Sequence, residues 1–352
     1  MKIILSIFCI CIFSLNCYSQ ISKNVKRDFS VFPVTEQLKV KDFLKAEQFS
    51  YEGIDLYRDS ILVLVNSKSN SQKHYFNFYN INTKQFLPGM LEGGRNEGHT
   101  TGFISYGLEK DYLWVLDANR EKIISLKTDS LHNSKVQRFI KEPYIPWVYY
   151  AAQLINDTTA LVNGDYDGAN DYKLAVFNLK TGKPTGYIVP YSADPAKPFK
   201  PEEKMAYESF LFIRPLKDKA VNASRFADRV EIVDLKTQQV KVVRGPEGFE
   251  PEFELMIRDD GKRIGVRTER NRFGFVAGKV TNQFIYLLYS GNLENTTHRW
   301  YGSTIYVYDW NGNSVKKLTL KNDIARFTVT ANDDKIYTYN PITKLISVAN
   351  LK

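Results

Sequence analysis

Cysteine is nearly absent from this sequence and is confined to one end of it. All three copies, Cys9, Cys11 and Cys17, lie within the first 20 of 352 residues. If these first residues are a leader that is removed, the mature chain has no thiol, no disulfide and no cysteine-bound metal, which excludes thiol catalysis. Four histidines leave little room for a histidine-rich metal site.

The catalytic signatures that can be recognised in a single sequence are also missing. The chain has no G-x-S-x-G elbow, no P-loop, no H-E-x-x-H and no G-x-G-x-x-G. The sequence therefore favours a protein that is not an enzyme. Whether acids from distant segments meet in the fold stays open at this stage.

Long apolar runs are lacking after the first 15 residues. The chain begins with Met1-Lys2, continues with the apolar run Ile3 to Leu15, and reaches a small residue at Ser19. A short basic start, an apolar stretch too short to span a bilayer and a small residue at the cut are typical of a secretory signal. We expect residues 1–19 to be cleaved and residues 20–352 to form a single domain.

An alternative places a lipid on Cys17. Lipoprotein cleavage prefers a small residue just before the cysteine and a Leu three positions before it, but Asn16 and Ser14 occupy these places. We therefore expect an exported protein, periplasmic or at the cell surface, with no transmembrane segment, and keep anchoring through Cys17 as the less favoured alternative.

Charge of one sign does not gather anywhere. Removing the leader takes away one Lys and no acid, which lowers the net charge from +9 to +8. The densest basic stretch, from Lys262 to Arg272, is interleaved with Asp259, Asp260 and Glu269. This pattern favours a solvated strand face, with contact to an anionic surface or glycan as the alternative, and it lacks the basic stripe of a nucleic-acid-binding protein.

Tyr and Phe are abundant, at 22 each, and one hairpin pattern recurs through the chain. An apolar-aromatic run ends in Asn or Asp, which is followed by a short turn and a second run. The six anchor residues are Asn80, Asp117, Asn178, Asp234, Asp309 and Asn340. An Asn or Asp side chain accepts hydrogen bonds from backbone N–H groups two residues on, and the flanking alternation predicts strands with one buried face.

The spacing of these hairpins predicts a repeat architecture. Successive anchors are 37, 61, 56, 75 and 31 residues apart, which averages 52. That is close to one four-stranded propeller blade with its loops. We therefore predict an all-β fold, a six-bladed β-propeller of four-stranded blades, with insertions in the connecting loops and at most a short helix at residues 201–207.

The ends of the chain are consistent with ring closure. Only one strand, Leu345 to Ala349, follows the last hairpin, so the last blade lacks a strand. Phe29 to Phe32 and Gln37 to Val40 are strand-like segments near the mature N-terminus. We expect one of them to pair with the last blade and remove its open edge.

The hairpin Ile305-Tyr306-Val307-Tyr308-Asp309-Trp310-Asn311-Gly312 and the strands that follow it resemble the TolB-like six-bladed propellers of Bacteroidota. The glycine- and glutamate-bearing loops at 93–98 and 244–248 are a second shared element. The resemblance implies the propeller fold and an exported protein of the cell envelope. It implies no catalytic residue.

Propeller ligands usually bind at the mouth of the central channel, where the loops that enter the inner strands converge. Charged and aromatic residues in such loops suit a sugar ring or a peptide carboxylate, and packing between blades is the structural alternative. The candidates are Arg95, Glu97, His99, Trp147, Tyr149, Glu208, His298, Arg299 and Trp300.

One loop has alternating acids that resemble a calcium site. It contains Asp165, Asp167, Asn170 and Asp171, but its Gly stands fourth rather than sixth, and no Glu closes it. An ordinary hairpin tip is favoured. No cofactor is expected, with calcium as the alternative.

Three functions remain, with different predicted partners. The favoured one is a non-enzymatic exported propeller that binds a protein or glycan of the envelope. The second is a calcium-dependent hydrolase, lactonase-like or lyase-like, with acids at the channel mouth. A component of a structural surface lattice is the third.

Overall fold

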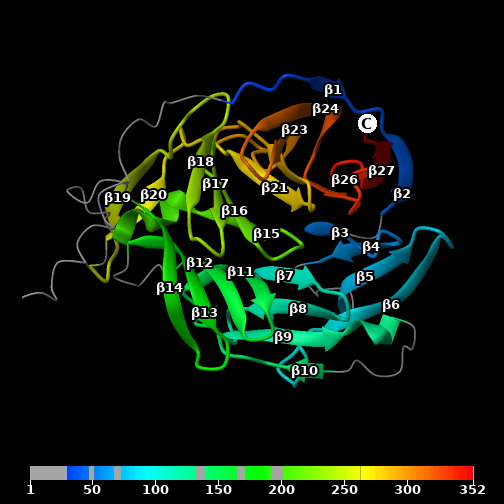
Figure 1. Cartoon of the computed structure of the whole chain (residues 1–352), viewed down its shortest axis with the longest axis horizontal. Helices are drawn as coiled ribbons and strands as arrows, with labels where there is room; N and C mark the ends of the chain where they lie inside the picture. The colour runs from blue at the N-terminus through cyan, green and yellow to red at the C-terminus, as the bar shows by residue number, and fades with distance from the viewer. Residues whose placement is uncertain are drawn as a thin grey trace, which may run out of the picture.

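The computed structural model describes residues 30–46, 51–66, 73–131, 139–164, 171–191, 201–261 and 263–351. In this part of the chain, six antiparallel sheets are arranged around one axis (Figure 1). The fold is a six-bladed β-propeller. Each blade has four strands, and one blade carries a fifth.

The first three blades follow one another along the chain. Blade I consists of β3 (Gly53–Tyr57), β4 (Ile61–Val65), β5 (His74–Asn80) and β6 (Gln85–Glu92). Blade II consists of β7 (Ser105–Leu108), β8 (Tyr112–Asp117), β9 (Lys122–Lys127) and β10 (Phe139–Lys141). Blade III consists of β11 (Tyr149–Asn156), β12 (Thr159–Gly164), β13 (Tyr172–Asn178) and β14 (Lys183–Pro190).

The other three blades include both ends of the described chain. Blade IV consists of β15 (Ser209–Ile213), β16 (Lys219–Ser224), β17 (Arg229–Asp234) and β18 (Val240–Arg244). Blade V consists of β21 (Phe275–Val280), β22 (Phe284–Tyr289), β23 (Gly302–Asp309), β24 (Ser314–Ile324) and β1 (Thr35–Gln37). Blade VI consists of β25 (Arg326–Val329), β26 (Lys335–Asn340), β27 (Leu345–Asn350) and β2 (Lys41–Lys45).

Helix is scarce in the described residues. Two 3₁₀ helices, η1 (Thr128–Leu131) and η2 (Pro201–Tyr207), are short, and η2 confirms the helix predicted there. A separate hairpin of β19 (Phe253–Ile257) and β20 (Arg263–Arg267) is inserted between blades IV and V and packs against η2. No described helix has the length and apolar character needed to cross a bilayer.

The core is divided among the blade interfaces. Six apolar clusters occur in the described residues, one between each pair of neighbouring blades. In β4 every side chain is buried, with Ile61, Val63 and Val65 facing blade II and Leu62 and Leu64 facing blade VI. Because successive side chains of a strand point to opposite faces, one strand serves two interfaces.

The same arrangement corrects the prediction that the alternating strands have one buried face. In β23, Tyr306 and Tyr308 pack towards blade IV, whereas Ile305 and Val307 pack towards blade VI. All four side chains are buried. The alternation of aromatic and aliphatic residues therefore separates two apolar interfaces and does not separate core from solvent.

An N-terminal strand closes the ring, as predicted. β2 pairs antiparallel with β27, Lys41 opposite Val348, and forms the outer strand of blade VI. The strand lies slightly further along the chain than the two segments proposed from the sequence. β1 precedes it and adds to blade V in parallel with β24, so both N-terminal strands lie at the rim of the ring (Figure 1).

Each predicted hairpin anchor makes the expected turn. The Oδ1 atom of Asn80 accepts hydrogen bonds from the backbone N–H groups of Asn82 and Thr83, at 2.9 and 3.0 Å. Asn178, Asp234, Asp309 and Asn340 each accept from two backbone N–H groups of their own turn, and Asp117 accepts from one, that of Arg120.

The hairpins do not, however, occupy one equivalent place in every blade. Four connect the third and fourth strands, but those of Asp117 and Asn340 connect the second and third strands. This difference explains the two short spacings that end at these anchors. The inserted hairpin of β19 and β20 explains the longest spacing, because it lies between Asp234 and Asp309.

Candidate functional site

The inner strands of the six blades all begin on the same face of the ring, because each blade repeats the same antiparallel order. Neighbouring inner strands contact one another around the axis, from β7 through β11, β15, β21 and β25 to β3. On this face, at the start of the inner strands or at the ends of neighbouring strands, lies a set of polar and aromatic residues to which every blade contributes. This mouth ring consists of Glu52, Tyr106, Tyr150, Glu208, Arg225, Tyr301 and Arg326.

Arg326 is the first residue of β25, the inner strand of blade VI. Its Nε donates to the carbonyl oxygen of Glu52, and its Nη1 donates to the carbonyl oxygen of Ala325 at 2.7 Å. Burial lowers the pKa of Arg326, whereas Tyr106 and Glu52 raise it and the neighbouring charge of Arg225 lowers it. The described residues provide no ion pair for this guanidinium.

The Tyr106 side chain of blade II packs against Gly53 of blade I, next to the mouth-ring residue Glu52. A Cβ atom at Gly53 would lie 2.9 Å from the Tyr106 hydroxyl, so the glycine leaves room for the phenol. Burial raises the pKa of Tyr106, Asp55 raises it further and Arg326 lowers it. The phenol is therefore neutral and presents its hydroxyl near the arginine.

Glu208 and Arg225 form the blade IV part of the mouth ring. Arg225 Nη1 donates to Glu208 Oε2 at 3.3 Å, and the guanidinium lies over the Phe210 ring, 4.4 Å from its centroid. The Arg225 Nε atom is buried and has no hydrogen-bond partner. An arginine held flat on an aromatic ring has a fixed orientation, which favours binding of a planar anion.

Tyr150 joins the mouth ring to a buried polar network between blades III and IV. Its hydroxyl accepts from the Ser209 N–H at 3.0 Å and donates to Asn163 Oδ1 at 2.8 Å. From Asn163 the hydrogen bonds continue outward to Asn222 at 2.6 Å, and from there to Glu231 at 2.8 Å. This network fixes the two blades relative to each other.

Below the mouth ring, three consecutive inner strands are cross-linked. Lys279 of β21 pairs with Asp55 of β3, and Thr328 of β25 donates to the same carboxylate at 3.1 Å. These two contacts form a layer of polar side chains below the mouth ring, on the side of the channel where Arg326 lies.

The structure places the predicted candidates on the same face but at different distances from the mouth ring. Arg95 and Glu97 are exposed, and His99 is half-buried, in the loop between β6 and β7. Glu142 holds this loop by accepting from the Gly98 N–H at 3.1 Å. Among the described residues, these three side chains make no contact with the mouth ring.

Trp147 lies in the loop that enters β11 and Tyr149 is the first residue of β11, and the two side chains have different surroundings. The Trp147 side chain is 56% exposed, and its backbone N–H donates to Glu121. The Tyr149 ring is buried and packs edge-on against Phe177 at 5.8 Å. Tyr149 thus serves the core between blades II and III.

The His298-Arg299-Trp300 segment lies beside the mouth ring in the connection between β22 and β23. His298 stacks on the mouth-ring residue Tyr301, with centroids 5.0 Å apart. Trp300 packs edge-on against the buried Phe273 at 4.3 Å. Arg299 lies over the same Phe273 ring. Of the nine predicted candidates, the structure thus brings Glu208 into the mouth ring and His298 next to it.

The calcium-like loop lies largely outside the described residues. This holds for Asp165, Asp167 and Asn170, whereas Asp171 is exposed just before β13. In the described part of the chain, no three His, Cys, Asp or Glu side chains are grouped closely enough to hold a metal.

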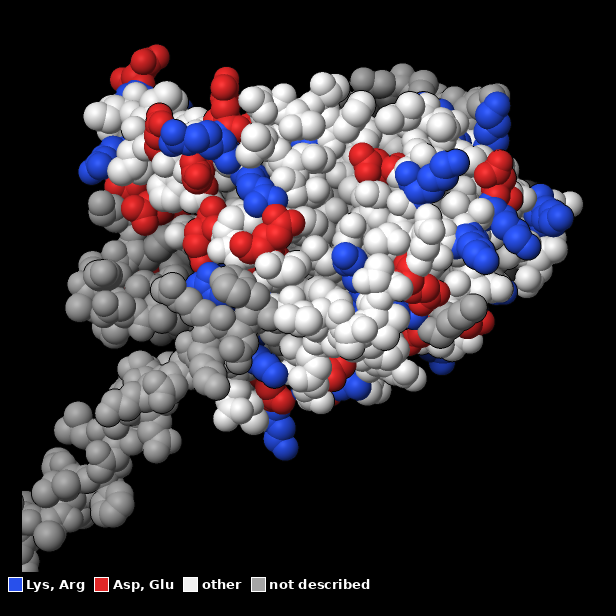
Figure 2. Space-filling model, turned by 90° about the horizontal axis from the view of Figure 1, so that it is seen from above, with Lys and Arg blue, Asp and Glu red and all other residues white. Residues whose placement is uncertain are grey.

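The basic stretch forms β20 and the residues after it, and its arginines are paired with acids. Arg263, Arg267 and Arg270 have Glu202, Glu294 and Glu252 as partners, at 3.6, 3.1 and 2.9 Å. Figure 2 shows the same alternation, with acidic and basic side chains interleaved over the visible surface. The sequence favoured a solvated strand face for this stretch. The charges of its arginines are in addition compensated by neighbouring acids.

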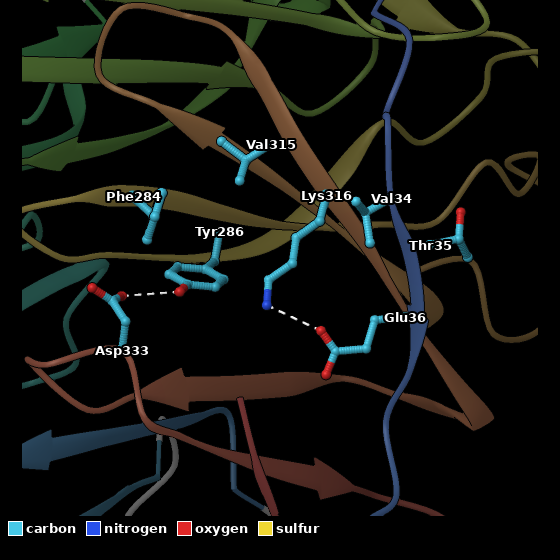
Figure 3. Close-up of a pocket in the computed structure, with 8 residues that line it drawn as sticks. All are labelled: Val34, Thr35, Glu36, Phe284, Tyr286, Val315, Lys316 and Asp333. Carbon is cyan, nitrogen blue, oxygen red and sulfur yellow. Dashed lines mark hydrogen bonds and ion pairs between the residues drawn. The ribbon is translucent and has the colours of Figure 1, made fainter. Parts of the chain in front are cut away.

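A hollow with a volume of about 530 Å³ lies at the opposite face, where blades V and VI meet (Figure 3). β1 forms one wall, and Tyr286 points its hydroxyl at Asp333, to which it donates at 2.9 Å. Lys316 pairs with Glu36 across the hollow at 3.0 Å. These polar groups bind one another and hold β1 in place.

The sequence does not single out six members of the mouth ring, namely Glu52, Tyr106, Tyr150, Arg225, Tyr301 and Arg326. Arg326 falls in one of the strands that follow the Asp309 hairpin, and no motif marks it as a residue of the channel. The missing signal is which strand of each blade is innermost. That choice depends on how six sheets pack together, and the hairpin pattern does not encode it.

The fold and the mouth ring define the class of protein, a six-bladed β-propeller with a polar channel mouth. The model of the family described as TolB-like 6-blade propeller-like matches residues 28–332, and the chain belongs to this family. The chain has no match among curated proteins.

Solved structures that align with the chain have very different sequences. A member of the DUF4221 family from Bacteroides vulgatus aligns with a TM-score of 0.55 at 10% identity, over 89% of this chain and 98% of that one. The β-propeller domain of Cps50 (Swd1) from Myceliophteria thermophila aligns with a TM-score of 0.46 at 9% identity, over 89% of this chain and 100% of that one. At such identities the first likeness shows the fold alone.

Proposed function

We propose that this protein is an exported, non-enzymatic propeller that binds a protein or glycan ligand of the cell envelope at its mouth ring. The observation that carries the proposal is the state of two arginines. Arg326 has no ion-pair partner among the described residues, and Arg225 keeps a buried Nε without an acceptor. Arg326 begins β25 and Arg225 directly follows β16, so both residues are anchored to the ring, which lowers the entropic cost of binding.

Binding is tested with residues 20–352 on arrays of defined glycans and peptides. We expect the wild-type protein to retain a ligand that the Arg326→Gln variant releases. Arg258→Gln is the matched control, because its guanidinium is exposed and pairs with Asp260 on the inserted hairpin. Equal retention by the wild type and Arg326→Gln would contradict binding at the mouth ring.

The export part of the proposal rests on the leader at residues 1–19. Mass spectrometry of the protein purified from its own envelope should give a chain that begins at Gln20. A lipid-modified Cys17 at the N-terminus would support anchoring instead. A chain that still contains Met1 in a cytosolic fraction would contradict export.

The calcium-dependent hydrolase is tested separately, by melting residues 20–352 with millimolar calcium and then with chelator. A site filled at a hundred times its Kd would add about 2.7 kcal/mol and raise the melting temperature by roughly 4 °C. The proposal expects no such shift. A shift of that size would favour the metal-dependent alternative.

A further inference from the structure

We propose that β19 pairs with β19 of a second copy of this chain, so that the inserted hairpin forms a twofold dimer through its free edge. The two strands run antiparallel, with Leu255 opposite Ile257 and the two Met256 residues opposite each other. The hairpin lies outside the six blades (Figure 1), and the inference does not depend on ligand binding at the mouth ring.

β19 is paired on one side only. It forms a two-stranded sheet with β20, and no other strand of the described residues joins this sheet. η2 contacts the hairpin mainly through β20. An unpaired edge presents N–H and C=O groups that can pair with another strand, and two strands alone rarely form a stable sheet. Pairing of two copies gives a four-stranded sheet.

The ladder between β19 and β20 shows which backbone groups lie on the free edge. The Thr268 N–H donates to the Glu252 carbonyl oxygen at 3.3 Å, and the register of the two strands continues from this pair. In an antiparallel ladder, pairs that exchange hydrogen bonds alternate with pairs that do not. The N–H and C=O groups of Phe253, Leu255 and Ile257 therefore point away from β20, and no backbone group of the described residues pairs with them.

The edge strand exposes large apolar side chains on both of its faces. Leu255 and Ile257 point to one face and Met256 to the other, because side chains alternate along a strand. The three residues are 39, 72 and 49% exposed, respectively. Exposed apolar side chains along an unpaired edge are typical of an interaction surface.

Charge complementarity favours a second copy as the partner of this edge. Glu254 is exposed and has no ion-pair partner among the described residues. Arg258 is exposed and lies 3.5 Å from Asp260. When two copies pair antiparallel about Met256, Glu254 of each chain lies opposite Arg258 of the other, and the twofold axis repeats this pair. Opposite charges at facing positions stabilise a sheet.

The same alignment uses the free backbone groups. Leu255 and Ile257 come opposite each other and exchange hydrogen bonds, twice in each dimer. Glu254 and Arg258 then form pairs without backbone hydrogen bonds, in which facing side chains are closest. A shift by one residue would bring Leu255 opposite Met256, whose backbone groups point to β20, so the hydrogen bonds could not form.

Sedimentation velocity of residues 20–352 over a series of concentrations tests the pairing. We expect the wild type to change from the mass of one chain to that of two in the micromolar range, as for a small interface. Met256→Lys should weaken the dimer by about 10-fold or more, because two ammonium groups then face each other. Ile342→Lys is the matched control and should dimerise like the wild type, since Ile342 is 61% exposed in the turn between β26 and β27.

Charge reversal tests the alignment itself. Glu254→Arg and Arg258→Glu should each weaken self-association by about 10-fold or more, because both symmetric pairs become like-charged. A mixture of the two single variants should form a mixed dimer, since each chain supplies the charge that the other lacks. The chain that carries both substitutions should dimerise with itself like the wild type. Each variant is first melted to show that the ring is intact.

Four outcomes would overturn the inference. A wild type that sediments as one chain at every concentration leaves the edge to a strand of another protein. A dimer that Met256→Lys and both charge reversals leave unchanged forms through another surface. A mass beyond two chains contradicts a closed twofold contact. Loss of the dimer in both single variants without recovery in their mixture contradicts the pairing of Glu254 with Arg258.

The dimer and the mouth ring can be tested separately. The hairpin lies outside the six blades, so loss of the dimer leaves each mouth ring intact. Arg258→Gln removes a charge from the hairpin and none from the mouth ring, and it therefore serves as a control for ligand binding there in either oligomeric state.

Discussion

Lys173 of blade III and Glu231 of blade IV form an ion pair inside the interface of the two blades. Nζ and Oε1 are 2.6 Å apart, and only 4% and 2% of the side chains are exposed. Burial raises the pKa of Glu231, but Lys173 and Arg229 outweigh it and hold the pKa below its usual range. Burial lowers the pKa of Lys173, whereas Glu231 raises it, so each partner favours the charged form of the other.

Breaking this pair should destabilise the ring asymmetrically. Glu231→Gln leaves Lys173 buried without its carboxylate and should cost about 3–5 kcal/mol. Lys173→Met should cost less, because Arg229 still pairs with Glu231 at 2.9 Å and Asn222 still donates to it. Urea denaturation measures the free energy of unfolding of both variants.

Asp260→Asn, which breaks an exposed pair with Arg258, should change stability by less than about 1 kcal/mol. Equal costs for the two buried variants would contradict this account.

The hairpin anchors should differ in their contribution to stability. Asn80 binds only its own turn and is half-buried, so Asn80→Ala should cost about 1 kcal/mol. Asp117 is fully buried and also accepts from Thr100 Oγ1 at 2.7 Å and from the Thr101 N–H at 2.9 Å. Asp117→Ala should therefore cost about 2–4 kcal/mol. Thermal melts of the two variants provide the comparison, and a smaller loss for Asp117→Ala would show that the loop rearranges.

Gly245 should not tolerate a methyl group. A Cβ atom there would lie 1.6 Å from Asp228 Oδ1, so Gly245→Ala must displace a buried carboxylate and should cost about 2–4 kcal/mol. Gly186 is the matched control, because a Cβ atom added there would meet nothing within 4 Å. Gly186→Ala should be neutral or stabilising by about 0.5–1 kcal/mol. Equal melting temperatures for the two variants would contradict the steric argument.

Asp228 should give the ring a distinctive pH dependence. Burial raises the pKa of Asp228 above its ordinary value, although the N–H groups of Glu247 and Gly248 donate to it. Above the ordinary pKa of the unfolded chain, the folded state holds more protons at this site, so rising pH destabilises the fold until the raised folded pKa is passed. Between pH 7 and pH 4, the free energy of unfolding of the wild type should therefore rise relative to that of Asp228→Asn as the pH falls. Urea denaturation at several pH values measures this difference. A stability difference that is constant over this range would contradict the raised pKa.

The local parts of the fold could be predicted from the sequence, and the long-range parts could not. The turn at Asn80 depends on hydrogen bonds within four residues, which one segment encodes. The alternation at Tyr306 and Val307 also indicates a strand correctly. The alternation does not show what packs against each face of the strand. Neighbouring blades cover both faces, although one face was expected to contact solvent.

The candidate site shows the same limit. Glu208 could be predicted because it is a charged residue in a connecting segment, where propeller ligands usually bind. Arg225 lies in a connection between β16 and β17 and reaches the mouth ring only because blade IV packs between blades III and V. Tyr149 was predicted at the channel mouth, but its ring packs in the core between blades II and III. Its neighbour Tyr150 belongs to the mouth ring.

The pairing of β2 with β27 has a consequence for the order in which the ring can be completed. One strand of blade VI is made at the beginning of synthesis and three at the end, so the last blade cannot assemble until residue 350 is present. Until then, β3 has no neighbour on one side, and the open ring exposes the apolar surfaces that will meet blade VI. A chain shortened at its C-terminus should therefore be degraded or aggregate rather than persist as a five-bladed ring.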